Sequence, residues 1–430
     1  MKKTKSLLTV AAVLLFAAAA MMAVRFSNRA ERLEARLREV YDGAVLSSLR
    51  QMEDMQVALS KALLSSDRGA EAQYLNQVSA GAAQVQRSLS LLPLSHTATQ
   101  NAVKFANQLA DYTAALLKTD ELTETDAATL GALISACADS AGALAQAGTA
   151  LSAQAVKGDA GFYPSGSQTA PAYDSAVSYP TLIYDGPFSD ARDTGPAKAL
   201  PDQPVTQEEA LAIARDFVGN ERVTEVSAGP EMGGSIPCWG AVVKLSDVTL
   251  YAAVTRQGGK MLYLAPDSAD FSPNKSVEEC RENALQFLES RGYAHMRPTY
   301  FQVYGGVAVI SFAATQGETV LYPDLIKVQC RLDTAQVVGW EARNYLQNHA
   351  PRGLLTPELT REEARANVSE RLALSSSRLC LIPTAGGEKL CYEFQGEYAG
   401  HTYLSYINAS TGRQEELLKV VEGAAGLETV

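Results

Sequence analysis

The stretch TQEEALAIARDFVG at residues 206–219 contains the pattern on which the fold of this chain is built. A threonine opens the stretch and a glutamate follows three residues later, which is the pattern of a helix capping box. In such a box the hydroxyl accepts a hydrogen bond from a first-turn amide, and the glutamate reaches back to the cap. The apolar residues Ala210, Ile213, Ala214 and Phe217 then fall on one helical face. We therefore expect an amphipathic helix that ends at Gly219.

The same pattern occurs twice more, as SVEE at residues 276–279 and TREE at residues 360–363. Each copy precedes another apolar helical face and then several runs typical of β-strands. This repetition predicts an α+β multidomain chain with three tandem small modules, each a helix packed on an antiparallel sheet. Their expected ranges are 205–272, 273–350 and 351–430.

The strands of each module are expected from short apolar or alternating runs between turn residues. Gly258-Gly259 and Thr411-Gly412 mark two hairpin turns. The expected strands cover residues 238–245, 250–255 and 260–264; then 300–304, 307–313, 325–332 and 336–342; and finally 379–382, 389–394, 402–408 and 415–420.

The N-terminus has the pattern of a membrane segment. Lys2, Lys3 and Lys5 precede an apolar run from residue 6 to residue 24, and Arg25 ends it. Nineteen such residues suffice for a helix to cross a bilayer core. We interpret residues 1–24 as a short cytoplasmic start and a transmembrane anchor. A cleavable signal peptide is the alternative, because small residues near 17–23 offer cleavage sites.

Residues 25–157 are predicted to form an all-α domain. Apolar residues continue the helical stripe of the anchor at Phe26, Ala30, Leu33, Leu37, Val40 and Ala44. Further helices are expected over residues 70–92, 98–117 and 126–155, the last capped by Thr123 and Asp126. An elongated antiparallel bundle fits this pattern, and a coiled-coil surface for a partner is the alternative.

Residues 158–204 contain seven prolines and five glycines, which predicts a linker. Its middle, residues 179–190 (YPTLIYDGPFSD), is apolar and aromatic. We expect that segment to dock against a neighbouring domain.

Composition limits the chemistry that the chain can perform. The 430 residues carry a net charge of −11 and only four histidines, which argues against nucleic-acid binding and against metal chemistry. The six cysteines lack metal-ligand spacing, and we interpret most of them as buried hydrophobic residues. Cys380 and Cys391, on successive expected strands, are the one pair that could face each other, and the sequence does not decide whether they form a disulfide.

Established catalytic motifs are also absent from the sequence. It contains no G-x-S-x-G, H-E-x-x-H, Walker loop or dinucleotide fingerprint. The Glu-Glu pairs are explained by capping. We therefore expect no enzyme activity, no cofactor and no bound metal. An enzyme with an unfamiliar constellation, such as a peptidoglycan hydrolase, stays open.

Several segments resemble the spore germination protein YpeB family. They are YPDLIKV at 322–328, VVGWEARNYLQNH at 337–349 and YPTLIYDGPFSD at 179–190. The third module adds LTREEAR at 359–365, LIPT at 381–384, CYEF at 391–394 and YINASTG at 406–412. The order of anchor, helical domain, linker and three repeats is also similar.

This resemblance implies that the modules are PepSY domains. It further implies a protein at the spore inner membrane, single-pass, with its ectodomain facing the cortex side. Its partner would be the cortex-lytic enzyme SleB or a similar hydrolase, which the protein would bind, localise and stabilise. The alternative is a PepSY-type regulator or inhibitor of an extracytoplasmic protease.

The residues specific to the family are the candidates for partner binding. They are Tyr179, Pro180, Tyr184, Asp185, Gly186, Pro187, Phe188, Tyr322, Pro323, Asp324, Trp340, Tyr345, Asn348 and His349.

Overall fold

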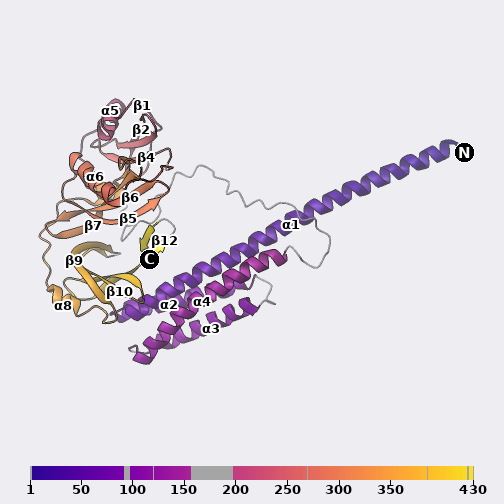
Figure 1. Ribbon diagram of the computed structural model, residues 1–430, viewed down its shortest axis with the longest axis horizontal. Helices are drawn as coiled ribbons and strands as arrows, with labels where there is room; N and C mark the ends of the chain where they lie inside the picture. The colour runs from indigo at the N-terminus through magenta and orange to yellow at the C-terminus, as the bar shows by residue number, and fades with distance from the viewer. Residues whose placement is uncertain are drawn as a thin grey trace. The chain divides into compact units, whose positions relative to one another are not determined.

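The computed structural model describes residues 2–91, 97–119, 121–155, 197–268, 270–384, 386–423 and 426–429 (Figure 1). The chain divides into two compact units. Unit 1 comprises residues 1–63 and 68–174, and unit 2 comprises residues 64–67 and 175–430.

Unit 1 is helical, as the sequence predicts. Its helices are α1 (Lys2–Leu64), α2 (Arg68–Leu89), α3 (Thr97–Leu116) and α4 (Glu124–Ala155). The predicted cap of α4 is confirmed, because the Asp126 amide donates to Thr123 Oγ1 at 3.2 Å and the Thr123 amide donates to Asp126 Oδ2 at 3.0 Å.

The helices of unit 1 pack closely where small residues allow it. A Cβ atom on Gly81 of α2 would lie 2.7 Å from the Met55 side chain of α1. The Ser79 and Thr113 hydroxyls join α2 to α3 at 3.0 Å, and Tyr112 of α3 donates to Asp126 of α4 at 3.0 Å. These contacts agree with the predicted bundle.

Helix α1 runs without interruption through the predicted anchor and the stripe that follows it. Its 63 residues correspond to about 95 Å of helix. The side chains of most of residues 6–24 lie outside the described set, so the anchor stays a prediction. Among the described residues, Glu124–Ala145 of α4 has the length and apolar composition of a membrane span, a property that core helices of soluble bundles share.

Unit 2 contains four helices in its described residues, each with a defined place among the strands. They are α5 (Gln207–Val218), α6 (Val277–Ser290), α7 (Arg343–Asn348) and α8 (Arg361–Arg365). The three capping boxes are confirmed: Thr206, Ser276 and Thr360 each accept from the amide of the glutamate three residues on, whose carboxylate accepts from the cap amide.

The strands of unit 2 follow these helices in groups. The first group is β1 (Glu225–Ala228), β2 (Cys238–Lys244), β3 (Thr249–Thr255) and β4 (Met261–Pro266). The second is β5 (Met296–Tyr304), β6 (Val307–Gln316), β7 (Thr319–Arg331) and β8 (Val337–Glu341). The third is β9 (Ala373–Thr384), β10 (Gly387–Tyr398), β11 (His401–Asn408), β12 (Gln414–Gly423) and β13 (Gly426–Thr429).

The strand groups of the three expected modules are joined to one another. All thirteen strands join in one sheet, in the order β1-β2-β3-β4-β8-β7-β6-β5-β13-β12-β11-β10-β9. The first group joins the second where β4 pairs with β8. The third group joins the second at two places, where β13 pairs with β5 and where β9 runs parallel to β7. A sheet made by one group alone would have edge strands with unpaired backbone N–H and C=O groups. Pairing with a strand of a neighbouring group provides these groups with hydrogen-bond partners.

The third predicted helix is shorter than its apolar pattern indicates. Helix α8 ends at Arg365, although Val368 and Leu372 are still buried in the turns that follow. The Asn367 side chain donates to the Glu363 carbonyl at 2.9 Å, while the Asn367 amide turns to Ala364. The Asn367 side chain therefore occupies the Glu363 carbonyl, which the Asn367 backbone amide would bind if the helix continued.

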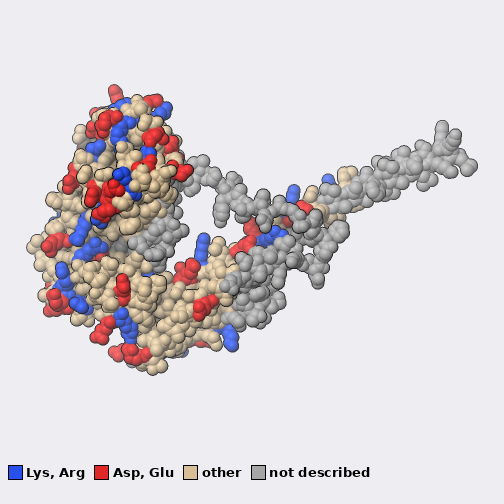
Figure 2. Space-filling view, in the orientation of Figure 1, with Lys and Arg blue, Asp and Glu red and all other residues tan. Residues whose placement is uncertain are grey.

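The core also crosses the group boundaries. One cluster combines α5, α6 and strands β2–β8 around the fully buried Trp340. A second combines β6 and β7 with β9–β11. On the face of unit 2 seen in Figure 2, acidic and basic side chains alternate without a large area of one sign.

Candidate functional site

The predicted residues Tyr322, Pro323 and Asp324 lie together in a bulge of β7. The register between β6 and β7 jumps here, since Ala313 pairs with Leu325 and Ala314 with Leu321. A bulge suits Pro323, which has no amide hydrogen to offer a neighbouring strand. The bulge keeps all three residues buried, and it frees their side chains and carbonyls for contacts beyond the sheet.

The end of the second predicted motif docks onto this bulge. Asn348, in the last turn of α7, donates from Nδ2 to the Pro323 carbonyl at 3.1 Å. His349, which caps the helix, places Nδ1 2.7 Å from Asp324 Oδ2. Two motifs 25 residues apart in sequence are thus brought together in the folded chain.

Arg352 completes the cluster and extends it to the third group of strands. Its Nη1 and Nη2 atoms donate to Asp324 Oδ2 and Oδ1, each at 2.7 Å. Its Nε and Nη2 atoms donate to Glu388 of β10 at 2.9 and 2.6 Å. Burial alone lowers the pKa of the Arg352 guanidinium, but the carboxylates of Glu388 and Asp324 outweigh it and hold that pKa above its ordinary value. We call Asp324, His349, Arg352 and Glu388 the Asp324 junction.

A series of aromatic rings connects the junction to the core. The Tyr345 ring stacks on His349 with 4.3 Å between centroids, and it also lies 5.2 Å from the Tyr293 ring. Tyr293 in turn lies 5.1 Å from Trp340. Trp340 Nε1 donates to the Met261 carbonyl at 3.0 Å, so that this buried indole ties β8 to β4.

Tyr322 belongs to a second buried network. Its hydroxyl donates to Glu393 and accepts from Arg378 Nη2 at 2.9 Å, while Arg378 Nε donates to Glu393 at 2.6 Å. Burial, followed by the nearby Glu393 carboxylate, raises the pKa of Tyr322 well above its ordinary value. Both networks link β7 to strands of the third group, and their polar groups are directed at one another. This arrangement fixes the geometry of the sheet.

The remaining predicted site residues lie outside the described residues. They are Tyr179, Pro180, Tyr184, Asp185, Gly186, Pro187 and Phe188, and the predicted docking of residues 179–190 stays a prediction.

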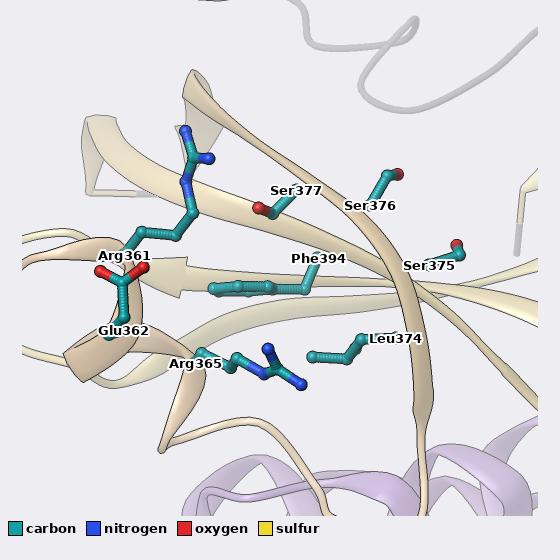
Figure 3. Close-up of a pocket in the computed structure, with 8 residues that line it drawn as sticks. All are labelled: Arg361, Glu362, Arg365, Leu374, Ser375, Ser376, Ser377 and Phe394. Carbon is teal, nitrogen blue, oxygen red and sulfur yellow. The ribbon is translucent and has the colours of Figure 1, made fainter.

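A pocket that sequence reasoning missed lies between α8, β9 and β10 (Figure 3). Its volume is about 190 Å³, and Figure 3 shows Arg361 and Arg365 reaching from α8 on either side of the Phe394 ring. The lining comprises Arg361, Glu362, Arg365, Leu374, Ser375, Ser376, Ser377 and Phe394.

The two arginines of this pocket are available to a ligand. Both are exposed, and among the described residues neither makes an ion pair or a side-chain hydrogen bond. Guanidinium groups bind carboxylates and phosphates with two hydrogen bonds. The one-turn spacing of Arg361 and Arg365 was visible in the sequence, but the approach of Ser375–Ser377 from β9 was not.

The cysteines are free thiols. Cys380 and Cys391, the pair that the sequence left open, are direct partners across β9 and β10, and both are buried without a disulfide between them. Among the described residues there is no group of three or more His, Cys, Asp or Glu that could hold a metal ion.

Comparison with known families identifies two matches. Residues 29–158 match the family described as "YpeB N-terminal", and residues 173–355 match "YpeB sporulation, PepSY1 and PepSY2 domains". The second range covers the first two predicted modules, so the assignment of the third as PepSY-like stays a prediction.

Curated relatives give the same result over part of the chain. Sporulation protein YpeB of Halalkalibacterium halodurans is 33% identical over 228 residues, which are 52% of this chain and 51% of the relative. Sporulation protein YpeB of Bacillus subtilis is 27% identical over 253 residues, 55% of this chain and 56% of the relative. The alignments therefore span about half the length of these relatives. The Bacillus megaterium YpeB C-terminal domain aligns with 50% of this chain and 98% of its own, at a TM-score of 0.46 and 24% identity.

Proposed function

The chain belongs to the YpeB family of sporulation proteins, and from this premise we propose that it is a non-catalytic, membrane-anchored partner of a cortex-lytic peptidoglycan hydrolase. It would act in spore germination by binding, localising and stabilising that enzyme. In this proposal residues 6–24 cross the spore inner membrane, and both units face the cortex.

Stabilisation would follow from mass action. A partner that binds only the folded hydrolase lowers the population of its unfolded, protease-sensitive form. At a partner concentration 100 times the dissociation constant, this effect is about 2.7 kcal/mol.

The observation that carries the proposal is the pocket beside β9. Strand β9 pairs with β10 along most of its length but with β7 only at Cys380 and Leu381. Among the described strands, the edge of β9 over residues 373–379 therefore has no partner. An extended segment of another protein can add to such an edge.

The chemistry of the pocket indicates what that segment would carry. Arg361 and Arg365 offer two positive charges without intramolecular ion pairs, and Leu374 and Phe394 supply an apolar floor. We infer that the segment is extended and carries a carboxylate at the point where it passes α8. A strand bound in this way would gain backbone hydrogen bonds from β9 and charge-assisted bonds from the arginines.

The first test compares spores with and without this protein. Spores lacking it should contain at least fivefold less of the cortex-lytic hydrolase, measured by immunoblot of spore membranes. Normal hydrolase levels in the absence of this protein would overturn the proposal.

The second test addresses the pocket. Arg361→Gln with Arg365→Gln should reduce co-purification of the hydrolase with the full chain at least tenfold. The matched control is Lys260→Gln with Arg297→Gln, which removes the same charge from two exposed residues elsewhere in unit 2. If hydrolase levels depend on the protein but both double variants bind equally, the partnership stands and the pocket is not its site.

The open edge of β9 also fits the alternative, a regulator of an extracytoplasmic protease, since an extended strand is the form in which proteases bind chains. This alternative predicts that the purified protein inhibits a secreted protease and that hydrolase levels do not depend on it. Release of muropeptides from cortex by the purified protein alone would instead indicate an enzyme.

A further inference from the structure

One face of α1 carries large apolar side chains that are exposed. The exposed fractions are 70% for Phe26, 61% for Leu33, 44% for Leu37 and 48% for Val40. With Ala30 and Ala44 these residues recur at alternating spacings of four and three. An average spacing of 3.5 residues is the heptad repeat of a left-handed coiled coil. We call residues 26–44 the α1 seam.

The seam ends where α1 enters the core of unit 1. Ala44 is buried, and from there on the buried residues of α1 include Ser48, Met52 and Met55. Packing inside unit 1 therefore leaves Phe26, Leu33, Leu37 and Val40 in contact with solvent. Contiguous exposed apolar side chains of this size mark a surface for another molecule.

The flanks of the seam are too polar for the bilayer core. Four arginines lie within the seam, at positions 29, 32, 36 and 38, and each charged side chain at the centre of a membrane costs free energy. The apolar stripe is also restricted to the two core positions of the heptad, which is narrower than the face of a helix that lies on a membrane surface.

We propose that the α1 seam pairs with the same seam of a second copy of this chain, as a parallel, in-register coiled coil. In that arrangement Phe26, Leu33 and Val40 occupy d positions and meet their own counterparts. Ala30 and Leu37 occupy a positions, and the next a position, Ala44, is already buried in unit 1. In a symmetric dimer the same surface of both copies forms the interface, so the apolar seam of one copy packs against the apolar seam of the other.

The charges beside the seam favour the parallel orientation. Arg29 and Arg36 occupy g positions, and position 34, a glutamate in the sequence, is an e position. In a parallel dimer each g residue faces the e residue five positions later in the partner helix, so that Arg29 meets Glu34. By the same rule Arg36 meets Tyr41, and an arginine can pair with an aromatic ring.

An antiparallel pair would bring like charges together. There g positions face g positions, and the arginines at 29 and 36 would meet arginines of the second helix. Like charges at these positions disfavour the antiparallel orientation.

The seam is about 28 Å long, less than three heptads, and a coiled coil of this length is weak on its own. Covalent trapping is therefore the appropriate measurement.

The test uses the full chain in the membrane of the cells that express it. Phe26→Cys, Leu33→Cys and Val40→Cys, each introduced singly, should form disulfide-linked dimers under copper-phenanthroline oxidation. Ala35→Cys is the control, because position 35 is an f position on the opposite face of the helix. The six natural cysteines are buried and free, so the unsubstituted chain reports their background. We expect at least tenfold more dimer from the three d positions than from position 35.

Each outcome decides the proposal. Equal cross-linking at positions 33 and 35 indicates random collision and overturns it. Cross-linking at position 33 without cross-linking at positions 26 and 40 indicates a crossed or antiparallel pair and overturns the parallel form.

A charge exchange tests the register. In the Leu33→Cys background, Arg29→Glu should reduce the amount of dimer at least threefold, and adding Glu34→Arg should restore it. Failure of the double exchange to restore the dimer contradicts the assigned register. All of these positions precede Ala44, where α1 enters the core of unit 1, so the variants leave that core unchanged.

Discussion

Asp324 and Arg352 form a two-pronged ion pair, with both guanidinium-to-carboxylate distances at 2.7 Å. The Asp324 side chain is completely buried and that of Arg352 is 10% exposed. The pair connects β7 to the start of β10, because Arg352 also binds Glu388 of β10. A buried charge of this kind is tolerated only while its partners stay in place.

Removing the carboxylate should therefore destabilise unit 2. Asp324→Ala leaves Arg352 with half of its hydrogen bonds, and breaking a buried pair in this way costs about 3–5 kcal/mol. The measurement is urea unfolding followed by the fluorescence of the two tryptophans of unit 2, Trp239 and the buried Trp340. Glu231→Ala, which breaks the more exposed pair with Arg256, should cost about 1 kcal/mol or less. Equal losses in the two variants would show that the junction does not hold the sheet together.

Trp340 should be the most sensitive position in the shared core of the first two strand groups. It is fully buried against Phe217, Phe287 and Tyr293. Trp340→Ala should lower the free energy of unfolding by about 3–5 kcal/mol, since it opens a cavity and leaves the Met261 carbonyl without its donor. Circular dichroism during urea unfolding measures the loss. Tyr251→Ala, at an exposed strand position, is the control, and a comparable loss there would contradict the prediction.

The capping boxes should make stability depend on acid. Hydrogen bonds from the cap backbone and side chains hold the pKa of Glu209, Glu279 and Glu363 below the ordinary value of 4.5. Because the pKa is lower in the folded state, the contribution is fully present above pH 4.5. It is lost as the pH falls through the folded value.

Exchange of these glutamates for glutamine removes the titration. The triple variant Glu209→Gln, Glu279→Gln, Glu363→Gln should show a flatter loss of stability between pH 5 and pH 3, measured by thermal unfolding. The matched variant changes the adjacent glutamates, Glu208, Glu278 and Glu362, which lie outside the caps. If that variant flattens the curve as much, capping is not the cause.

Five of the six thiols have a raised pKa and should react slowly while the protein is folded. The hydrogen bond with Cys330 lowers the pKa of the sixth, Cys280, whose protection depends on its complete burial. Burial raises the pKa of Cys137 and Cys391 to about 12 and that of Cys238 to about 11. At pH 8 such groups carry little thiolate, the reactive form. A thiol reagent should therefore label the native chain roughly a hundredfold more slowly than the chain in urea. Fewer than six reactive thiols in urea would reveal a disulfide, and Cys380–Cys391 is the pair to examine.

The fold was predictable from sequence where the deciding interactions are local. Thr206 and Glu209 are three residues apart, so their mutual hydrogen bonds depend on one helical turn and can be read directly. The hairpin glycines at 258, 259 and 412 adopt positive φ angles, as their turns require. By contrast, α7 and the strands β1 and β13 were missed, since none of them is long enough to show a clear period.

The candidate site was predictable only in part. The motifs at Tyr322–Asp324 and Trp340–His349 were identified by resemblance, and the structure brings them together in and around the Asp324 junction. Arg352 and Glu388 were not predicted, because a charged residue in a loop gives no sign of the carboxylate it will meet. The pocket was missed for the same reason. The position of β9 in the sheet brings Ser375–Ser377 close to Arg361, and no local sequence pattern indicates that position.

The sequence by itself determined the helices of unit 1, the three capped helix starts of unit 2, the order of the strand groups and the heptad spacing of α1. These features depend on hydrogen bonds and side-chain periods within a few residues. Only the tertiary structure decided that the strand groups join in one sheet, that Asp324 pairs with Arg352 and Glu388, and which face of α1 stays exposed. Strand edges and buried charges take whichever partner lies nearest in space, and that proximity arises only when distant parts of the chain pack together.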